Sequence, residues 1–596
     1  MSISAEYALA HKKDPAVLCC RTEAGTVIEA HNLEDPAIFD DLVDSNLLSL
    51  EGCLTIQEVL GAKLTKTCDS LTALTPAVLE GIQKIQEEAP AVPAPSPVPA
   101  PLPASGGVFR IDIAEGKDIH IEIPMGLLGA APAMPAAEEK EPAPKLVRSL
   151  TRKHFAVTEV RRGPETKLEG TVLYIREGIE KDCIASQALV YDLKIDIITP
   201  DLYHTYSETI MDVQPIAAKE GDCELGSGVT RVLDGVVMMV TGTDANGVQI
   251  GEFGSSEGYL DENILWGRPG APDKGEIFIK TQVTIKEHTN MERPGPMAAH
   301  AATDVITQEI REALKKAEES LIVSEETFDQ FRRPGQKKVV IVKEIMGQGA
   351  MHDNLILPVE PVGVLGAKPN VDLGNVPIGV SPLEVLDGCI HALTCIGPAS
   401  KEMSRHYWRE PLVLEVLKDE ELDLCGVIFV GSPQINAEKF YVSKRVGQLC
   451  EMMDVDGAFI TTEGFGNNHI DFASHHEQIG MRGISVVGLS FCAAQGALVV
   501  GNKYMTHMVD CNKSTSGIEN EVLACNTLCP EDAVRAIQLL KNAMAGEPVL
   551  AAEKKWNPEV KSSNLKIMER ETGKRIETEL NEQSLPMSQK RREKYD

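Results

Sequence analysis

A run rich in proline and alanine is the feature that most constrains how this chain folds. Residues 89–107 consist almost entirely of proline, alanine, valine, serine and glycine. Such a tract cannot bury a core and behaves as a semi-rigid, extended spacer. A looser tract of similar character occupies residues 127–145. We therefore expect a separate N-terminal module, residues 1–88, and a core that begins at residue 146.

Residues 108–126, between the two tracts, alternate apolar and polar side chains on both sides of a short polar turn. This pattern predicts a β-hairpin. An isolated hairpin is at best marginally stable in water, so we expect it to dock on the core or on a partner. Within the N-terminal module, the apolar spacing predicts a hairpin over residues 17–28 and helices between residues 54 and 82.

The core changes character near residue 395. Residues 146–394 have mostly strand-like alternation, and their clearest predicted elements are strands at 171–174, 190–197, 232–240 and 338–342 and a helix at 298–317. Residues 395–596 alternate between strands at 425–430, 457–461, 484–489 and 497–501 and helices at 437–453 and 469–480, and they end in a charged tail. Such alternation indicates a parallel sheet with helices on its faces. The predicted fold class is mixed α/β, with a β-rich first half of the core followed by a largely parallel sheet.

The charge and the cysteine content limit the partners and the compartment. A formal net charge of −31 argues against binding to nucleic acid or to an anionic membrane surface. Residues 483–502 lack charge over a length that could cross a bilayer, but their glycine, serine and amide residues fit two buried strands better. The N-terminus has no secretory signal, and 14 cysteines without such a signal favour a reducing cytoplasm.

The stretch 387–398 contains a cysteine, Cys395, that follows Thr394 directly. A free cysteine is usually a buried, inert side chain. It can also attack the carbonyl of the preceding residue and convert the peptide bond to a thioester by an N-to-S acyl shift. Because the ordinary pKa of a cysteine is about 8.5, a group that takes the thiol proton would help. His391 could shuttle that proton, although a half-buried histidine with satisfied hydrogen bonds is the more ordinary explanation.

Two further polar stretches flank this one. The stretch 347–353 ends in His352 and Asp353, which could form an acid/base pair or cap a loop. In the other stretch, a predicted strand runs into Glu463 and Asn467, where a helix is expected to begin. Ligands of open parallel sheets bind at this edge, so both are candidate site-lining residues. The glycines between them lack the third glycine of a dinucleotide fingerprint, and no pattern of metal ligands is present.

In this order, the three stretches resemble those of the proprotein subunits of the clostridial amino-acid reductases. Members of that family cut themselves at an X–Cys bond to make a pyruvoyl cofactor, and the resemblance covers essentially the whole chain. It implies cleavage between Thr394 and Cys395, with Cys395 as the pyruvoyl precursor. The mature chains would be residues 1–394 and 395–596. The Thr-Cys junction is that of the D-proline reductases, whereas the glycine reductases cut at Asn-Cys.

The resemblance also implies a reaction and partners. The reaction is the reductive ring opening of D-proline to 5-aminovalerate in Stickland fermentation. The pyruvoyl ketone would form an iminium with the ring nitrogen and so make it a leaving group. A selenocysteine- or cysteine-containing subunit would supply the second nucleophile, and an electron-donating thiol or redox protein would reduce it, within a large hetero-oligomer. An arginine should bind the substrate carboxylate, and the candidates are Arg268, Arg293 and Arg405.

Two other functions remain open at this point. The chain could be the paralogous proprotein of a glycine, sarcosine or betaine reductase, although Thr394 before the cysteine argues against this. It could also be an uncleaved scaffold that uses its linkers and hairpin to assemble other subunits. The mass of the purified protein distinguishes a scaffold from a self-cleaving enzyme.

Overall fold

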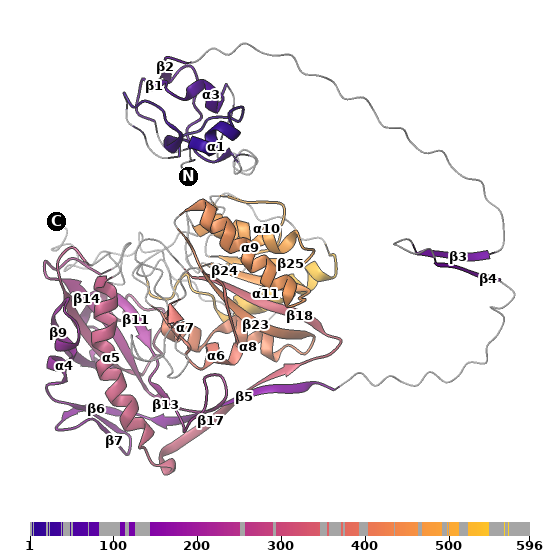
Figure 1. Ribbon diagram of the computed structural model, residues 1–596. Helices are drawn as coiled ribbons and strands as arrows, with labels where there is room; N and C mark the ends of the chain where they lie inside the picture. Colours follow the sequence, from indigo (N-terminus) through magenta and orange to yellow (C-terminus); the bar gives the residue numbers. More distant parts are fainter. Residues whose placement is uncertain are drawn as a thin grey trace, which may run out of the picture.

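The structure of the chain is a computed structural model (Figure 1). It describes residues 3, 5–19, 22, 24–36, 39, 48, 50, 52–68, 71–82, 143–250, 257–289, 294–345, 376–392, 403–433, 435–462, 468–490, 498, 500–511, 522–547, 566 and 570, and the backbone of 108–113, 119–124, 355–356 and 371–372. The expected hairpin is present in the backbone, where β3 (Val108–Ile113) pairs with β4 (Ile119–Pro124) in antiparallel register.

Two four-stranded sheets form most of the β-rich half of the core. The first has the order β12 (Ala217–Lys219), β13 (Gly228–Asp234), β5 (Lys145–Ala156), β17 (Ile322–Arg332). The second has the order β11 (Ile210–Gln214), β14 (Val236–Asp244), β16 (Ile277–Ile285), β9 (Val190–Ile198). A smaller sheet contains β6 (Glu159–Gly163), β8 (Val172–Arg176) and β7 (Lys167–Glu169). The helices α4 (Ile179–Ser186) and α5 (Pro294–Lys315) bury apolar side chains in the same core as these strands.

A six-stranded sheet forms the second half of the core. Its order is β21 (Ile378–Val380), β23 (Leu422–Gly431), β18 (Lys337–Ile345), β24 (Gly457–Thr462), β25 (Ser485–Ser490), β26 (Met508–Asp510), and only β21 is antiparallel to its neighbour. The helices α9 (Asn436–Met452) and α10 (Asn468–Gly480) cover one face, and α8 (Pro411–Lys418) and α11 (Pro530–Met544) cover the other. The predicted mixed α/β fold with a largely parallel sheet is confirmed.

The strand β18 lies at the centre of this sheet although it precedes the Thr394–Cys395 junction in the chain. It pairs in parallel with β23 on one side and with β24 on the other, and both of these follow the junction. Alternate side chains of β18 face opposite layers, so that Val339 and Ile341 pack towards α8 and α11 while Val340 and Val342 pack towards α9 and α10. The two halves of the chain therefore share one hydrophobic core.

Gly235 divides residues 232–240, which the sequence predicts to be one strand. Residues 232–240 form the end of β13 and the start of β14, which belong to different sheets. Gly235 has a φ of 83°, and a Cβ there would lie 2.4 Å from the carbonyl oxygen of Val157. Only glycine suits both constraints. The strand expected at 497–501 is also wrong, because residues 498, 500 and 501 belong to no strand and β26 follows instead.

The N-terminal module is less regular than its sequence suggested. Its elements are α1 (Ala5–Ala10), α3 (Ile56–Val59), β1 (Lys63–Leu64) and β2 (Leu79–Glu80). The predicted pairing within residues 17–28 is wrong for the described residues, because Val17 bridges to Ala73 and Val27 to Lys63. The predicted helical stretch is reduced to α3, which ends just before Gly61 with its positive φ of 83°. These distant bridges replace the local pairing.

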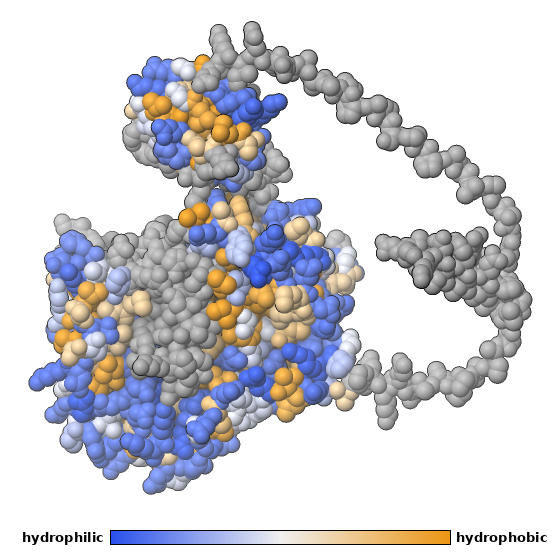
Figure 2. All heavy atoms as spheres, in the orientation of Figure 1, coloured by the Kyte–Doolittle hydropathy of each residue, from blue (hydrophilic) through white to orange (hydrophobic). Residues whose placement is uncertain are grey.

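The module packs against the second half of the core. Val17, Phe39 and Leu48 share an apolar cluster with Ala473 of α10 and with Val500. On the face shown in Figure 2, hydrophilic side chains cover much of the described surface, in keeping with the high charge of the chain. Among the described helices, none combines the length and the apolar character that a membrane crossing requires.

Candidate functional site

The sequence predicts a site around the junction at residues 394–395, and the structure describes the chain on both sides of it. Thr394, Cys395, His352, Asp353, Glu463 and Asn467 lie outside the described residues. His391 is described, at the end of β22 (Ile390–His391). Ala392 is the last described residue before the junction. Met403 is the first one after it and directly precedes α7 (Ser404–Trp408). These two flanks locate the ends of the segment 393–402.

Backbone pairing places His391 beside a short strand from another part of the chain. In the sheet of β20 (Val371–Asp372), β19 (Leu355–Ile356) and β22, Leu355 lies opposite His391 in antiparallel register. The predicted stretch 387–398 is thus anchored in a sheet through its described part.

His391 is completely buried, not half-buried as expected. Its Nε2 lies 3.1 Å from each carboxylate oxygen of Asp304 on α5, and its ring meets that of His300 edge-on at 5.7 Å. Burial acts to lower the pKa of His391, but the Asp304 carboxylate outweighs it and raises the pKa, which favours the imidazolium. Burial and the nearby charge of His391 lower the pKa of His300 to about 4, so that ring stays neutral. Within the described residues, Nδ1 of His391 has no hydrogen-bond partner.

A second buried carboxylate, that of Asp212 on β11, joins the two flanks of the segment 393–402. The backbone N–H and the hydroxyl of Ser404 donate hydrogen bonds to Asp212 at 2.9 and 2.7 Å. The Ser404 hydroxyl oxygen in turn accepts a 2.9 Å hydrogen bond from the backbone N–H of Ala392. Gln214 also donates to Asp212, at 2.9 Å. One carboxylate and one hydroxyl thus hold the residue before the segment close to the start of α7.

Asp387 anchors the chain upstream of His391. It follows α6 (Pro382–Leu386) and accepts hydrogen bonds from Lys219 at 2.7 Å, from the backbone N–H of Gly226 at 2.8 Å and from Thr230 at 2.5 Å. These three partners belong to or adjoin β12 and β13, so the β-rich half positions the short chain that leads into β22. Burial raises the pKa of Asp387, although Lys219 opposes this effect.

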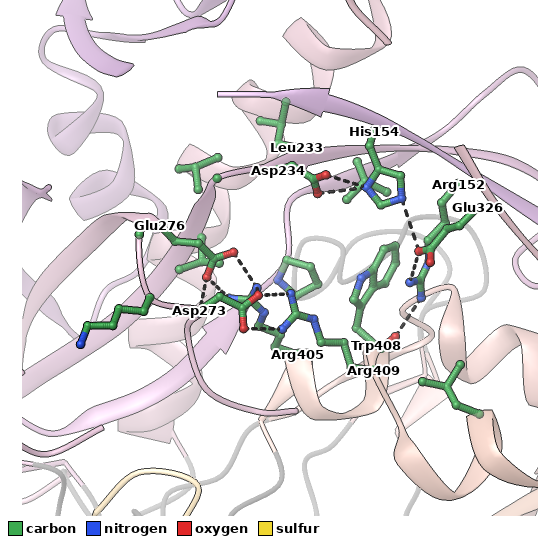
Figure 3. A pocket seen from close by; sticks show the side chains of 18 of the residues that line it. Arg152, His154, Leu233, Asp234, Asp273, Glu276, Glu326, Arg405, Trp408 and Arg409 are labelled. Atoms are coloured by element: carbon green, nitrogen blue, oxygen red, sulfur yellow. Dashed lines mark hydrogen bonds and ion pairs between the residues drawn. The ribbon is translucent and has the colours of Figure 1, made fainter. Parts of the chain in front are cut away.

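A cleft of about 830 Å³ opens on another side of α7 (Figure 3). Its lining includes Arg405 and Trp408 of α7, the adjoining Arg409, and Arg152 and His154 of β5. The Trp408 ring lies between two groups of ion pairs, and the Arg152 guanidinium stacks 3.8 Å from its centroid. Ser404 of α7 therefore binds Asp212, while Arg405 and Trp408 of the same helix line this cleft.

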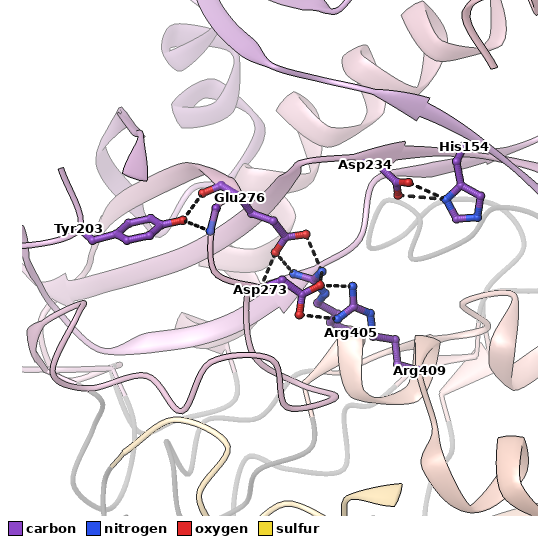
Figure 4. A network of polar contacts seen from close by, with 8 residues as sticks. His154, Tyr203, Asp234, Asp273, Glu276, Arg405 and Arg409 are labelled. Carbon is purple, nitrogen blue, oxygen red and sulfur yellow. Dashed lines mark hydrogen bonds and ion pairs between the residues drawn. The ribbon is translucent and has the colours of Figure 1, made fainter. Parts of the chain in front are cut away.

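The arginines of α7 are already paired with carboxylates (Figure 4). Arg405 binds Glu276 with both terminal nitrogens at 2.6 Å, and Arg409 binds Asp273 at 3.0 and 2.7 Å. A guanidinium held in this way is a structural tie between α7 and the turn before β16. Of the three arginines considered for the substrate carboxylate, Arg405 is thus engaged, Arg268 lies 3.9 Å from Glu531, and Arg293 lies outside the described residues.

Sequence reasoning missed a buried polar cluster at the carboxyl edge of the six-stranded sheet. Glu344 at the end of β18 accepts a hydrogen bond from Thr462 at 3.1 Å and lies 3.7 Å from Nε2 of His475. Beside it, Lys439 and Ser432 both contact Asp471. Burial raises the pKa of Glu344 well above its ordinary value and that of Asp471 to about 6, while it lowers the pKa of His475 to about 3. The available signal was a pair of charged residues, Lys343 and Glu344, that follows the apolar run Val339–Val342 of β18.

The comparisons with known proteins assign the chain to a family. The sequence pattern of the glycine/sarcosine/betaine reductase component B subunits matches residues 148–498. The chain belongs to this family. It is 66% identical to the D-proline reductase proprotein of Acetoanaerobium sticklandii, over 100% of both chains. It is 24% identical to the glycine reductase complex component B subunits alpha and beta and to the sarcosine reductase complex component B subunit alpha of Peptoclostridium acidaminophilum, in each case over 56% of this chain and 76% of the relative. No solved structure matches the chain significantly.

The component B match covers the functional features described above. It begins within β5 and ends beyond β25, so it contains the junction, the Asp212 and His391 contacts and the polar cluster around Glu344. It leaves out the N-terminal module, the two proline-rich tracts and the hairpin. The D-proline reductase proprotein of A. sticklandii matches those parts as well, because its similarity spans the whole chain.

The His154 ion pairs in the cleft predict a pH-dependent contribution to stability. Hydrogen bonds with Asp234 and Glu326 raise the pKa of His154 to about 9, against an ordinary value of 6.5. A raised folded-state pKa stabilises the fold below pH 6.5, and this contribution is lost as the pH rises through 9. We expect His154→Gln to lower the free energy of unfolding by about 1 kcal/mol at pH 6, because both carboxylates are partly solvated, and to have little effect at pH 10.

Urea unfolding followed by tryptophan fluorescence at several pH values measures this difference. The control is His204→Gln, which removes an exposed histidine next to the exposed Asp261. The control should change stability little at any pH. A loss of stability in His154→Gln that is the same at pH 6 and pH 10 would assign the effect to packing and not to charge.

Proposed function

We propose that this chain is the proprotein of the pyruvoyl-bearing subunit of a D-proline reductase, acting in the reducing cytoplasm. The observation that carries the proposal is the 66% identity to the D-proline reductase proprotein of A. sticklandii over the full length of both chains. The Thr394–Cys395 junction supports it, because a cysteine at that position is required for the chemistry below. The lower identity and partial coverage of the glycine and sarcosine relatives do not favour either of those substrates.

Maturation would begin with attack of the Cys395 thiol on the Thr394 carbonyl carbon, which converts the amide to a thioester. Elimination then breaks the Cβ–S bond and releases the upstream chain as a thiocarboxylate. The dehydroalanine that remains tautomerises, takes up water and releases ammonia, which leaves a pyruvoyl group at position 395. His391 is suited to move a proton in this sequence, because Asp304 orients its ring through Nε2 and Nδ1 has no partner among the described residues.

The mature subunit would provide an electrophile and a substrate site. The pyruvoyl group supplies a ketone that condenses with the secondary amine of D-proline and activates the ring nitrogen as a leaving group. The residues suited to frame this group are His391 and Ser404, which flank the segment 393–402, and Asp304 and Asp212, which contact them. Burial raises the pKa of Glu344 at the carboxyl edge of the six-stranded sheet, which makes it a second candidate for proton transfer.

The reducing nucleophile would come from a partner subunit. Burial raises the pKa of Cys183 and of Cys450 to about 12, and that of Cys389 well above its ordinary value, which makes these thiols poor nucleophiles. The sequence contains no selenocysteine. Because the glycine and sarcosine relatives are subunits of reductase complexes, we assign the second nucleophile to a selenocysteine- or cysteine-containing subunit of a hetero-oligomer, with an electron-donating thiol or redox protein to restore it.

Reductive trapping tests the substrate assignment. Cyanoborohydride added together with radiolabelled D-proline should attach one proline to the chain 395–596, because the reagent reduces an iminium in preference to a free ketone. The label should be absent in Cys395→Ala and with radiolabelled glycine. The isolated protein should bind D-proline without producing 5-aminovalerate, and the partner subunit with a dithiol should restore turnover. Labelling by glycine and not by D-proline would keep the chemistry and replace the substrate.

A further inference from the structure

The segment 393–402 has its two ends tied together by a small, buried relay of hydrogen bonds. Ala392 precedes the segment, and its backbone N–H donates to the Ser404 hydroxyl oxygen. Ser404 begins α7 just after the segment, and both its backbone N–H and its hydroxyl donate to Asp212. All three residues are completely buried. The relay brings together positions that are 192 residues apart in the sequence.

The relay can meet a geometric requirement of the acyl shift. The acyl shift requires the Cys395 sulfur to reach the Thr394 carbonyl carbon, which sets a geometric requirement on the backbone around the junction. Fixing both ends removes much of the entropy that would be lost on reaching that geometry. Ser404 holds both ends at once, since its hydroxyl accepts from the upstream flank and donates to Asp212.

Asp212 has no cationic side chain as a direct hydrogen-bond partner in the described residues. Ser404 and Gln214 donate hydrogen bonds to it. The charged or titratable groups that face this region are His391 of β22 and three residues of α5, namely His300, Asp304 and Arg311. Burial raises the pKa of Asp212 and outweighs the charge of the nearby His391, which favours the ionised form. Burying this carboxylate therefore costs free energy, and the hydrogen bonds that it accepts from Ser404 are candidates for a role beyond stability.

We infer that Asp212 and Ser404 are positioning residues for self-cleavage at Thr394–Cys395, holding both ends of the segment 393–402 in the arrangement from which the acyl shift starts. The inference rests on the proposed function. It gives Asp212 and Ser404 a positioning role that is separate from the nucleophilic attack by Cys395. Neither side chain needs to touch the reacting atoms. Their removal should therefore slow maturation.

The test follows maturation of the full-length chain. Wild type, Asp212→Asn and Ser404→Ala are made by cell-free synthesis, synthesis is stopped, and intact mass gives the cleaved fraction over time. We expect each variant to cleave about 10- to 100-fold more slowly than wild type, the range that a misplacement of about 1 Å produces. Ser404→Thr, which keeps the hydroxyl, should cleave at a rate closer to that of wild type.

Two further measurements separate positioning from a general loss of structure. Thr281→Val removes another completely buried hydroxyl, which contacts Thr303 and not the flanks of the segment, and it should cleave at the wild-type rate. Burial raises the pKa of Asp212 to about 6, and only the ionised carboxylate accepts both bonds from Ser404 without competition from its own proton. Wild-type cleavage should therefore fall as the pH drops through 6, and this step should be missing in Asp212→Asn.

The outcomes distinguish this inference from the proposed function. Wild-type rates in both Asp212→Asn and Ser404→Ala would overturn the inference and leave the proposed function standing. A wild-type chain that never cuts between residues 394 and 395, even with its partner present, would overturn the proposed function. If the two variants melt at much lower temperatures than wild type, the comparison of Ser404→Ala with Thr281→Val decides, because each removes one completely buried hydroxyl. Equal slowing in these two would also overturn the inference.

Discussion

Cys395→Ala is expected to leave a single full-length chain, whereas the wild-type protein is expected to yield residues 1–394 and 395–596. Alanine has no nucleophile for the acyl shift, and no other side chain can replace a thiol that must attack the adjacent carbonyl. The smaller wild-type chain should resist Edman sequencing, because a pyruvoyl group has no α-amine. In the complete complex, turnover of D-proline by the variant should fall to background, since nothing else in the chain activates the ring nitrogen.

The matched control for this experiment is Cys389→Ala. Cys389 lies in the same stretch of sequence but is buried in the hydrophobic core, and burial raises the pKa of its thiol well above the ordinary value. This variant should still cleave and should lose only some stability. Intact mass and D-proline turnover measure both effects. A smaller wild-type chain that begins with an unmodified cysteine, or undiminished turnover by Cys395→Ala, would place the electrophile elsewhere.

The two mature chains are expected to remain one folded particle after cleavage. The strand β18 comes from residues 1–394, yet it lies between β23 and β24 of residues 395–596. Five of its apolar side chains are completely or almost completely buried: Val339, Val340, Ile341, Val342 and Ile345. Each contributes about 1.5–3 kcal/mol by burial, so exposing all five would cost as much as the entire stability of a typical domain.

An ion pair across the same boundary adds to this cost. Lys343 of β18 donates to Glu410 at 2.8 Å, and neither side chain is exposed to solvent. Glu410 caps α8, where its other oxygen accepts from the backbone N–H of Val413 at 2.6 Å. Loss of Lys343 would leave a buried, unpaired carboxylate, at a cost of about 3–5 kcal/mol. Separation of the chains would therefore break the sheet, the core and this pair together.

Size-exclusion chromatography under native conditions should show both cleaved chains in one peak, and denaturing electrophoresis should show two bands. Residues 395–596 expressed alone should be insoluble or unfolded, whereas co-expression with residues 1–394 should restore a folded particle. The co-expressed pair controls for the effect of the new chain ends. Free exchange of the smaller chain between labelled particles at neutral pH would contradict the shared-sheet explanation.

Local patterns were sufficient for much of the fold. The periodicity of apolar residues predicted α9, α10, β24 and β25 to within a residue or two, because each element is long enough for its own period to show. The alternation of residues 108–126 predicted the paired strands β3 and β4. The same reasoning failed in the N-terminal module, where bridges such as Val17 to Ala73 join distant residues. It also joined β13 to β14, because a single glycine, Gly235, turns the chain between two sheets.

The sequence by itself determined the chemistry that the junction can perform, since a thiol next to a carbonyl is a property of two adjacent residues, Thr394 and Cys395. Only the tertiary structure decided which groups contact the described residues on either side of it. Asp304 and Asp212 show no local pattern, yet folding buries one against His391 and the other against Ser404. Burial then sets their effect, because removal of water shifts the pKa of Asp212 and strengthens its hydrogen bonds. A buried hydrogen bond between residues 192 positions apart depends on how the sheets pack, and no local sequence pattern contains that information.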